Sequence, residues 1–155
     1  MALKKEKDEL DKKDVEIIKL LSMNARMSYN EIARALNMSD VAVMKRIRRL
    51  EQIGVIKRYT IAIDLAKLGF NAISITGINV RPERLFHVLS ILKQKPYIRF
   101  LALTSGDHPI MAVIIARDNE ELARIHDEIS RLPGIEKVYP ALLLEVVKEG
   151  CNNFL

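Results

Sequence analysis

Six basic side chains lie close together between Val41 and Arg58, and the only acidic residue after Val41 in this stretch is Glu51. The six are Lys45, Arg46, Arg48, Arg49, Lys57 and Arg58. Lysine and arginine neutralise phosphates, and arginine can also donate two hydrogen bonds to the edge of a guanine. The chemistry that this stretch favours is therefore nucleic-acid binding. The alternative is a helix with an ordinary solvated face, which is the commoner role of a run of charges.

A short helix is predicted just before the basic run. Ser28 and Glu31 have the S-x-x-E spacing of a capping box, so this helix should begin at Tyr29. Asn37 tolerates the left-handed conformation that ends a helix. The residues that the helix would bury are Ile32, Ala33 and Leu36.

A second helix should run from about residue 40 to residue 52, with Ser39 as its cap. Val43, Ile47 and Leu50 have the spacing i, i+4 and i+7, so they share one face. The opposite face carries Val41, Lys45 and Arg48. A helix that is anchored on one side and basic on the other, after a tight turn, is typical of a helix-turn-helix, whose second helix enters the major groove.

We expect Val41, Lys45 and Arg48 to touch base edges. Arg46, Arg49, Lys57 and Arg58 should lie nearer the phosphate backbone. The full set of candidate DNA-contacting residues is Ser28, Ser39, Asp40, Val41, Ala42, Lys45, Arg46, Arg48, Arg49, Lys57 and Arg58.

The flanking segments complete a small domain. Asp11 is a good cap for a helix that should extend to about Met23, with Val15, Ile18 and Leu20 or Leu21 turned inward. Residues 55–63, after the helix-ending Gly54, alternate in part like a strand and would form the wing of a winged helix. We therefore assign residues 1–63 to a winged helix-turn-helix domain, with a charged lead-in over residues 1–10 and a connector over residues 64–71.

Residues 72–155 contain an internal duplication with an offset of 37 residues. Leu85, Val88, Leu92, Pro96 and Ile98 fall on Leu122, Ile125, Ile129, Pro133 and Ile135. Each half is predicted to form a strand, a helix and a strand. The first half has a strand at residues 72–80, a helix from Pro82 to before Pro96, and a strand at residues 98–104. The second half has a strand at residues 110–116, a helix capped by Asp118, and a strand at residues 135–147. This order indicates a ferredoxin-like βαββαβ domain with an antiparallel sheet and both helices on one face, and an α+β fold overall.

Continuous apolar runs occupy the predicted strands at residues 100–103, 111–115 and 142–144. A sheet wetted on one side should instead alternate between apolar and polar residues. A second copy of the chain packed against the open side would explain the pattern. Such a homodimer would place two recognition helices about 34 Å apart, on successive major grooves of double-stranded DNA.

Composition sets further limits. Of the net charge of +5, residues 1–64 contribute +4, from 14 basic and 10 acidic residues, so the excess lies with the helix-turn-helix. The single Cys151 cannot form an internal disulfide, which fits a reducing compartment. No apolar run is long enough to cross a bilayer, and the N-terminus lacks an apolar signal core. We expect a soluble, cytoplasmic protein with no membrane partner.

From Asp11 to about Lys148 the sequence resembles the Lrp/AsnC family of transcription regulators, the leucine-responsive or feast/famine type. The matching residues are Asp11, Asp14, Ile17, Ile18, Asn24, Ala25, Arg26, Ser28, Glu31, Ile32, Ala33, Arg46, Ile47, Leu50, Glu51, Gly54, Val55, Ile56, Ile63, Asp64, Leu68, Gly69, Gly106 and Asp107. The resemblance implies a DNA-binding domain followed by a domain that dimerises, assembles into tetramers or octamers, and senses small molecules, most often amino acids.

The resemblance also points to Gly106, Asp107 and His108 as effector-binding residues. This chain departs from the family there, because Gly106-Asp107-His108-Pro109 replaces a Gly-Asp-x-Asp loop, and Tyr139-Pro140-Ala141 stands where a hydroxyl residue often begins the last strand. Asp107 could hold a ligand ammonium, but Pro109 and Pro140 remove backbone donors that a carboxylate needs. We therefore expect weak or absent binding of most simple amino acids. The alternative is that Gly106-Asp107 only forms a hairpin turn.

Catalytic chemistry finds little support. His87, His108 and His126 are isolated and lack metal-ligand spacing, and the sequence has no phosphate loop or dinucleotide fingerprint. We expect neither enzyme activity nor a metal or other cofactor. The rival enzyme class is the sirohaem decarboxylases, which resemble this architecture but use histidine-rich tracts. A DNA-coating architectural protein is the other alternative, and it differs from a local regulator mainly in its specificity ratio.

Overall fold

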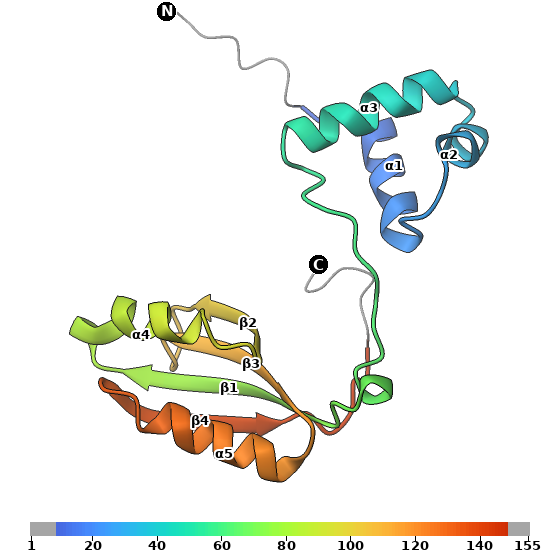
Figure 1. Ribbon diagram of the computed structural model, residues 1–155. Helices are drawn as coiled ribbons and strands as arrows, with labels where there is room; N and C mark the ends of the chain where they lie inside the picture. The colour runs from blue at the N-terminus through green and yellow to red at the C-terminus, as the bar shows by residue number, and fades with distance from the viewer. Residues whose placement is uncertain (1–8, 149–155) are drawn as a thin grey trace, which may run out of the picture. The chain divides into compact units, whose positions relative to one another are not determined.

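The computed structural model describes residues 9–148, and the chain divides into two compact units (Figure 1). The first unit includes the chain up to Ala62 and, after the second unit, Lys148; it holds α1 (Lys12–Met23), α2 (Tyr29–Leu36) and α3 (Asp40–Gln52). The second unit spans Ile63–Val147 and contains a four-stranded sheet with two α-helices. Each unit has its own buried core.

Side-chain caps define where the first three helices begin. Asp11 and Ser28 each form a complete capping box, with Asp14 and Glu31 respectively, and Ser39 accepts a hydrogen bond from the N–H of Ala42. The predicted start and end of both helices in the helix-turn-helix are confirmed. Asn37 has φ 51°, in the left-handed region, and so provides the tight turn between them.

The core of the first unit lies where the three helices meet. Its buried residues are Ile17, Ile32, Ala33, Val43, Ile47 and Leu50. The prediction that Val15 faces inward is wrong, since Val15 is 39% exposed and Asp14 is fully buried in its place. The inward face of α1 is set by Ile17 and by the partners of the Asp14 carboxylate, which hydrophobic spacing alone does not reveal.

The predicted wing strand is absent: the structure assigns neither helix nor strand to residues 57–64. The segment follows Gly54, whose φ of +77° ends α3 as predicted. Its apolar side chains are largely exposed, with Tyr59 at 49% and Ile61 at 74%. A strand needs a hydrogen-bonded neighbour, and within residues 9–148 no other segment pairs with this one.

The second unit is the predicted ferredoxin-like arrangement. Its elements are the short 3-10 helix η1 (Ala66–Leu68), β1 (Ala72–Val80), the 3-10 helix η2 (Pro82–Arg84), α4 (Leu85–Leu92), β2 (Ile98–Leu103), β3 (Ile110–Ala116), α5 (Asn119–Ser130) and β4 (Ile135–Leu142). The sheet order is β2-β3-β1-β4, with every neighbouring pair antiparallel. The last strand is shorter than predicted, because it ends at Leu142 and leaves Leu144 93% exposed.

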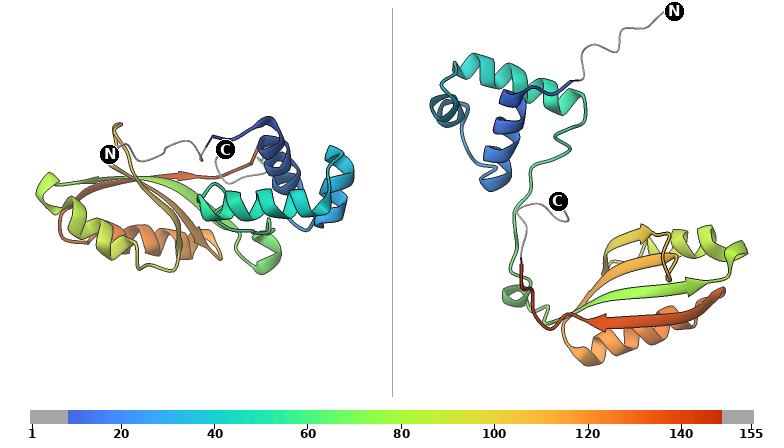
Figure 2. Two further views of the ribbon diagram at one scale, coloured as in Figure 1. Left: turned by 90° about the horizontal axis from the view of Figure 1, so that it is seen from above. Right: turned by 180° about the vertical axis from the view of Figure 1, so that it is seen from behind.

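Both long helices of this unit pack on one face of the sheet (Figure 2). Val88 and Leu92 of α4, and Leu122, Ile125 and Ile129 of α5, share one core with the alternate strand residues. Those strand residues are Ala72, Ile78, Val80, Ile110, Ala112, Ile114 and Ala116.

The opposite face of the sheet carries no helix and is largely apolar. We call it the open face; its principal residues are Ile73, Ile75, Phe100, Met111, Val113 and Tyr139. Ile75 is 42% exposed, Phe100 41% and Tyr139 38%. A large exposed apolar patch marks an interaction surface more often than a solvated one.

One histidine lies between α5 and the sheet. The Nε2 atom of His126 is 3.0 Å from the hydroxyl oxygens of both Ser74 and Thr76, which are fully buried. Burial lowers the pKa of His126 below its usual 6.5, because the charged ring would lose solvation. The imidazole is therefore held neutral as a hydrogen-bonding group within the fold.

We expect acid to destabilise the second unit through His126. Because its folded pKa is lowered, its contribution is complete above the unfolded value near 6.5 and is lost as pH falls through the folded pKa. Thermal unfolding should therefore show a decline between about pH 7.5 and about pH 5 that is smaller in His126→Gln. His87→Gln, which removes an exposed histidine of α4, is the control. An unchanged pH profile in His126→Gln would contradict the assignment.

Candidate DNA-binding and effector sites

The solvent-facing side of α3 presents the side chains predicted to read bases. Val41 is 49% exposed, and Lys45 and Arg48 are also exposed. Val43, Ile47 and Leu50, on the opposite side of α3, are buried at 0%, 1% and 0%. Within residues 9–148, neither Lys45 nor Arg48 forms a hydrogen bond or an ion pair through its side chain. Both cations are therefore available to a ligand outside the chain.

Arg46 and Arg49 have a different role from the predicted backbone contacts. The Nη1 atom of Arg46 lies 2.6 Å from Asp11 and 2.8 Å from Asp14, and Arg49 lies 2.5 Å from Asp14. The side chain of Asp14 is fully buried, whereas those of the arginines remain 31% and 34% exposed. The two arginines hold α3 against α1, and any contact that they make with DNA stays a prediction.

The same cluster affects protonation at its rim. The N–H of Asp14 and the guanidinium of Arg46 lower the pKa of the Asp11 carboxyl. Hydrogen bonds to Asp14 and Asp11 raise the pKa of Arg46. Asp11 and Arg46 therefore stay charged together, and their ion pair helps to hold α3 against the start of α1.

The remaining candidate DNA contacts lie at helix starts or in the extended segment. Ser28 and Ser39 are exposed caps of α2 and α3, and Asp40 accepts a hydrogen bond from the N–H of Val41 at 2.8 Å. Ala42 is half-buried in the first turn of α3. The last two, Lys57 and Arg58, are exposed beyond the end of α3.

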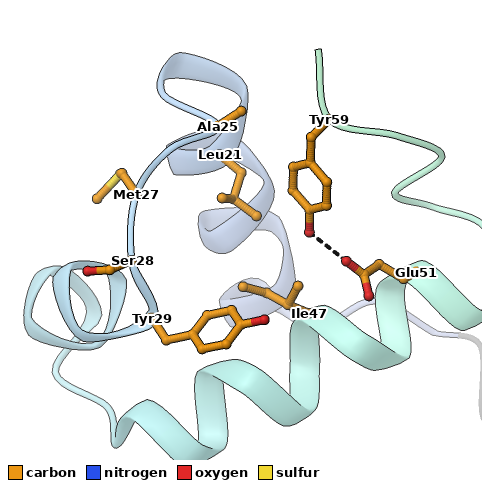
Figure 3. A pocket seen from close by; sticks show the side chains of 8 residues that line it. All are labelled: Leu21, Ala25, Met27, Ser28, Tyr29, Ile47, Glu51 and Tyr59. Atoms are coloured by element: carbon orange, nitrogen blue, oxygen red, sulfur yellow. Dashed lines mark hydrogen bonds between the residues drawn. The ribbon is translucent and has the colours of Figure 1, made fainter.

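A pocket of about 410 Å³ is bordered by the end of α1, the start of α2, α3 and Tyr59 (Figure 3). Its residues are Leu21, Ala25, Met27, Ser28, Tyr29, Ile47, Glu51 and Tyr59. The hydroxyl of Tyr59 donates a hydrogen bond to Glu51 at 2.7 Å, drawn as a dashed line in Figure 3. Burial and the Glu51 carboxylate raise the pKa of Tyr59 to about 12.

This hydrogen bond ties the segment that carries Lys57 and Arg58 to α3. Sequence reasoning missed it, since a contact between residues eight apart across a turn has no sequence signature. The bond limits where the two basic residues can lie relative to the exposed face of α3.

The loop between β2 and β3 carries the predicted effector residues. Thr104 closes it through a hydrogen bond from its N–H to the carbonyl of Pro109 at 2.9 Å, and through its hydroxyl to the carbonyl of His108. Gly106 and Asp107 are exposed at the tip. Within residues 9–148, the Asp107 carboxylate has no hydrogen-bond or ion-pair partner. The geometry of this loop is compatible with a simple hairpin turn and also with a site where the Asp107 carboxylate binds a ligand cation.

His108 lies apart from that tip, over the open face. Its Nδ1 atom is 2.8 Å from the side-chain oxygen of Asn79, and its ring centroid is 4.5 Å from that of Tyr139. A Cβ added at Gly77 would lie 2.3 Å from the ring, so only glycine leaves room for it there. Sequence reasoning missed Gly77, Asn79 and Tyr139 as neighbours, although a glycine inside a strand is a signal of close approach.

Two negative findings apply to the described part of the chain. No group of three or more histidine, cysteine, aspartate or glutamate residues within residues 9–148 could hold a metal ion. No helix in that range is long and apolar enough to cross a membrane. The prediction about Cys151 lies outside the described residues.

Family models match both halves of the chain. Residues 10–51 match the AsnC-type helix-turn-helix domain, and residues 73–152 match the Lrp/AsnC ligand binding domain. The chain is 47% identical over 140 residues to the HTH-type transcriptional regulator LrpA of Pyrococcus horikoshii, covering 90% of this chain and 99% of that protein. It is 31% identical over 142 residues to the HTH-type transcriptional regulator Ptr1 of Methanocaldococcus jannaschii, covering 91% and 96%.

Known structures show the same fold. The structure of B. subtilis LrpC has a TM-score of 0.84 at 27% identity, covering 92% of this chain and 99% of that one. The structure of E. coli AsnC has a TM-score of 0.85 at 21% identity, covering 92% and 97%.

Proposed function

The chain belongs to the Lrp/AsnC family of DNA-binding transcriptional regulators, and we propose that it reads its operator through Val41, Lys45 and Arg48. The observation that carries this assignment is the contrast along α3. Lys45 and Arg48 are exposed and unpaired in the described chain, whereas Arg46 and Arg49 are bound to Asp11 and Asp14. A cation without an internal partner can turn all of its donors toward a guanine edge.

Backbone contacts are proposed for the residues around this face. Ser28 and Ser39 lie at helix N-termini, where N–H groups and the helix dipole favour a phosphate. Lys57 and Arg58 would bind the flanking backbone from the segment that Tyr59 ties to Glu51. Phosphate contacts of this kind set position and affinity but carry no sequence information.

Comparing Arg48→Ala with Lys57→Ala should distinguish recognition of bases from contacts with the phosphate backbone. On the operator Arg48→Ala should cost about 1–3 kcal/mol and relax the base preference at one position. Lys57→Ala should instead weaken binding to all duplexes similarly and reduce the salt dependence of binding by about one phosphate contact. Titrations of operator and unrelated duplexes at several salt concentrations measure both effects. If Arg48→Ala binds the operator as tightly as the unmodified chain does, the reading face is misassigned.

We also propose a homodimer that joins through the open face, with further assembly to tetramers or octamers. Ile75, Phe100 and Tyr139 are exposed there without a covering helix, which supports a second copy as the partner. We propose a non-enzymatic role, which the similarity to transcriptional regulators supports. We also propose a cytoplasmic location, because a regulator of this kind has to reach its DNA.

An amino-acid effector, if it binds, is proposed to do so near Gly106, Asp107 and His108. The unpaired Asp107 could take an ammonium, while Asn79 and Tyr139 lie beside His108. We expect weak or absent binding of most amino acids in calorimetry, because Pro109 and Pro140 offer no N–H to the carboxylate. Any binding that is seen should be lost in Asp107→Ala. Tight binding that survives this change would leave the loop as a turn only.

A further inference from the structure

A second cavity, of about 610 Å³, lies in the second unit, far along β3 from the His108 loop. Ile115 and Arg117 line it at the C-terminal end of β3, whereas the loop precedes the N-terminal end of that strand. Phe70, Pro96 and Ile125 supply further apolar lining. The volume falls within the range of about 300–1,000 Å³ that small-molecule sites occupy.

Two cations at this cavity have no internal partner. Among residues 9–148, the guanidinium groups of Arg99 and Arg117 form no hydrogen bond or ion pair. A third arginine of the lining, Arg124, pairs with Glu120 at 2.9 Å, but both side chains are mostly exposed, at 66% and 83%. A guanidinium presents donors in a planar fork that matches a carboxylate.

The acidic groups of the lining are already engaged. Glu128 lies 2.6 Å from the ammonium of Lys95, which lowers the pKa of the Glu128 carboxyl. Glu121 accepts the backbone N–H of Arg117 at 2.6 Å. Excess positive charge therefore faces the cavity, and a ligand ammonium finds no unpaired carboxylate.

The hydroxyl of Tyr97 adds a neutral donor. Its oxygen is buried and forms no hydrogen bond of acceptable geometry in the described part of the chain, although it interacts with the Glu128 carboxylate. Burial and the nearby Glu128 carboxylate raise the pKa of Tyr97, so the hydroxyl keeps its proton. A buried hydroxyl without a well-formed hydrogen bond is stabilised when a ligand or water accepts from it.

We infer that this cavity binds a small organic carboxylate that has an apolar body and no ammonium group. Arg99 and Arg117 hold the carboxylate, and Phe70, Ile115 and Ile125 line the space for the body. The site goes beyond the proposed function, since it lies at the other end of β3 from the Asp107 loop and selects against the ammonium that Asp107 would attract.

Calorimetry on the full chain with matched probes tests the assignment without DNA, so its failure is distinguishable from failure of the DNA-binding proposal. 3-Phenylpropanoate has the carboxylate and the apolar body, L-phenylalanine adds the ammonium, and inorganic phosphate lacks the body. We expect 3-phenylpropanoate to bind with one site per chain and at least about tenfold more tightly than either comparator, because the ammonium of L-phenylalanine would lack a partner and phosphate buries no apolar surface.

Arg99→Gln and Arg117→Gln should each weaken 3-phenylpropanoate binding about tenfold or more. Arg131→Gln, which removes a cation directly after α5 that pairs with Asp127 and does not line the cavity, should leave it unchanged. Thermal unfolding of each variant checks that the fold is intact. The inference is overturned if no binding is seen at about 10 mM ligand, a concentration well above the dissociation constant that a few such contacts should give. Equal binding of L-phenylalanine, or binding unaffected by both arginine changes, overturns it as well.

Discussion

Val113→Asp is expected to convert the assembled protein into monomers. Val113 lies on the open face, where it pairs across the sheet with Ile75 on β1 and Phe100 on β2. In a symmetric dimer that joins through this face, each interface would contain the new carboxylate twice. A buried charge without a partner costs about 3 kcal/mol or more, so the dimer dissociation constant should rise more than about a hundredfold.

Analytical ultracentrifugation of the full chain measures this effect. Ala123→Asp is the matched control, because it places the same charge on an exposed position of α5 and should leave the sedimentation unchanged. Circular dichroism of Val113→Asp checks that the second unit remains folded. The open face is not the interface if the unmodified chain sediments as a monomer at micromolar concentration. The same conclusion follows if Val113→Asp assembles to the same extent as the unmodified chain.

Asp14→Ala should cause the largest loss of stability in the first unit. The change leaves Arg46 and Arg49 without the buried carboxylate that both bind, and it removes half of the capping box of α1. Removing one partner of a buried pair costs about 3–5 kcal/mol, and the partial exposure of both arginines reduces this to about 2–4 kcal/mol. For a small domain, a loss of this size lowers the melting temperature by roughly 10–30 °C.

Glu16→Ala is the control for Asp14→Ala. It also removes an acid from α1, but Glu16 forms only a surface pair with Lys13, in which both side chains are about half exposed, at 45% and 44%. This control should change stability by less than about 0.5 kcal/mol. A melting temperature of Asp14→Ala equal to that of Glu16→Ala would show that the cluster does not hold α3 in place.

Local features of the fold could be predicted from the sequence. The caps Ser28 and Ser39, the turn at Asn37 and the end of α3 at Gly54 each depend on a few neighbouring residues, and all are present. The order of strands and helices in the second unit followed from the repeated pattern of apolar residues, and it is confirmed. In these places, local preference and tertiary structure agree.

Contacts between distant residues could not be predicted in this way. The bonds from Asp14 to Arg46 and Arg49 join residues 32 and 35 apart, so the charges of α3 look alike in sequence although two of them are held internally. The wing strand was predicted from its own alternation, but pairing depends on a neighbour that no local pattern supplies. The cavity at Arg99 and Arg117 likewise needs the sheet to bring two strands and a helix together.

Selection of bound sequences from a random duplex library tests the central claim most directly, namely that the exposed face of α3 reads bases. For the unmodified chain we expect a motif of two half-sites about one helical turn apart, with a guanine preference in each. Arg48→Ala should flatten that preference, whereas Lys57→Ala should return the same motif from weaker binding. Recovery of the unmodified motif by Arg48→Ala, with the same base weights at every position, would contradict the account.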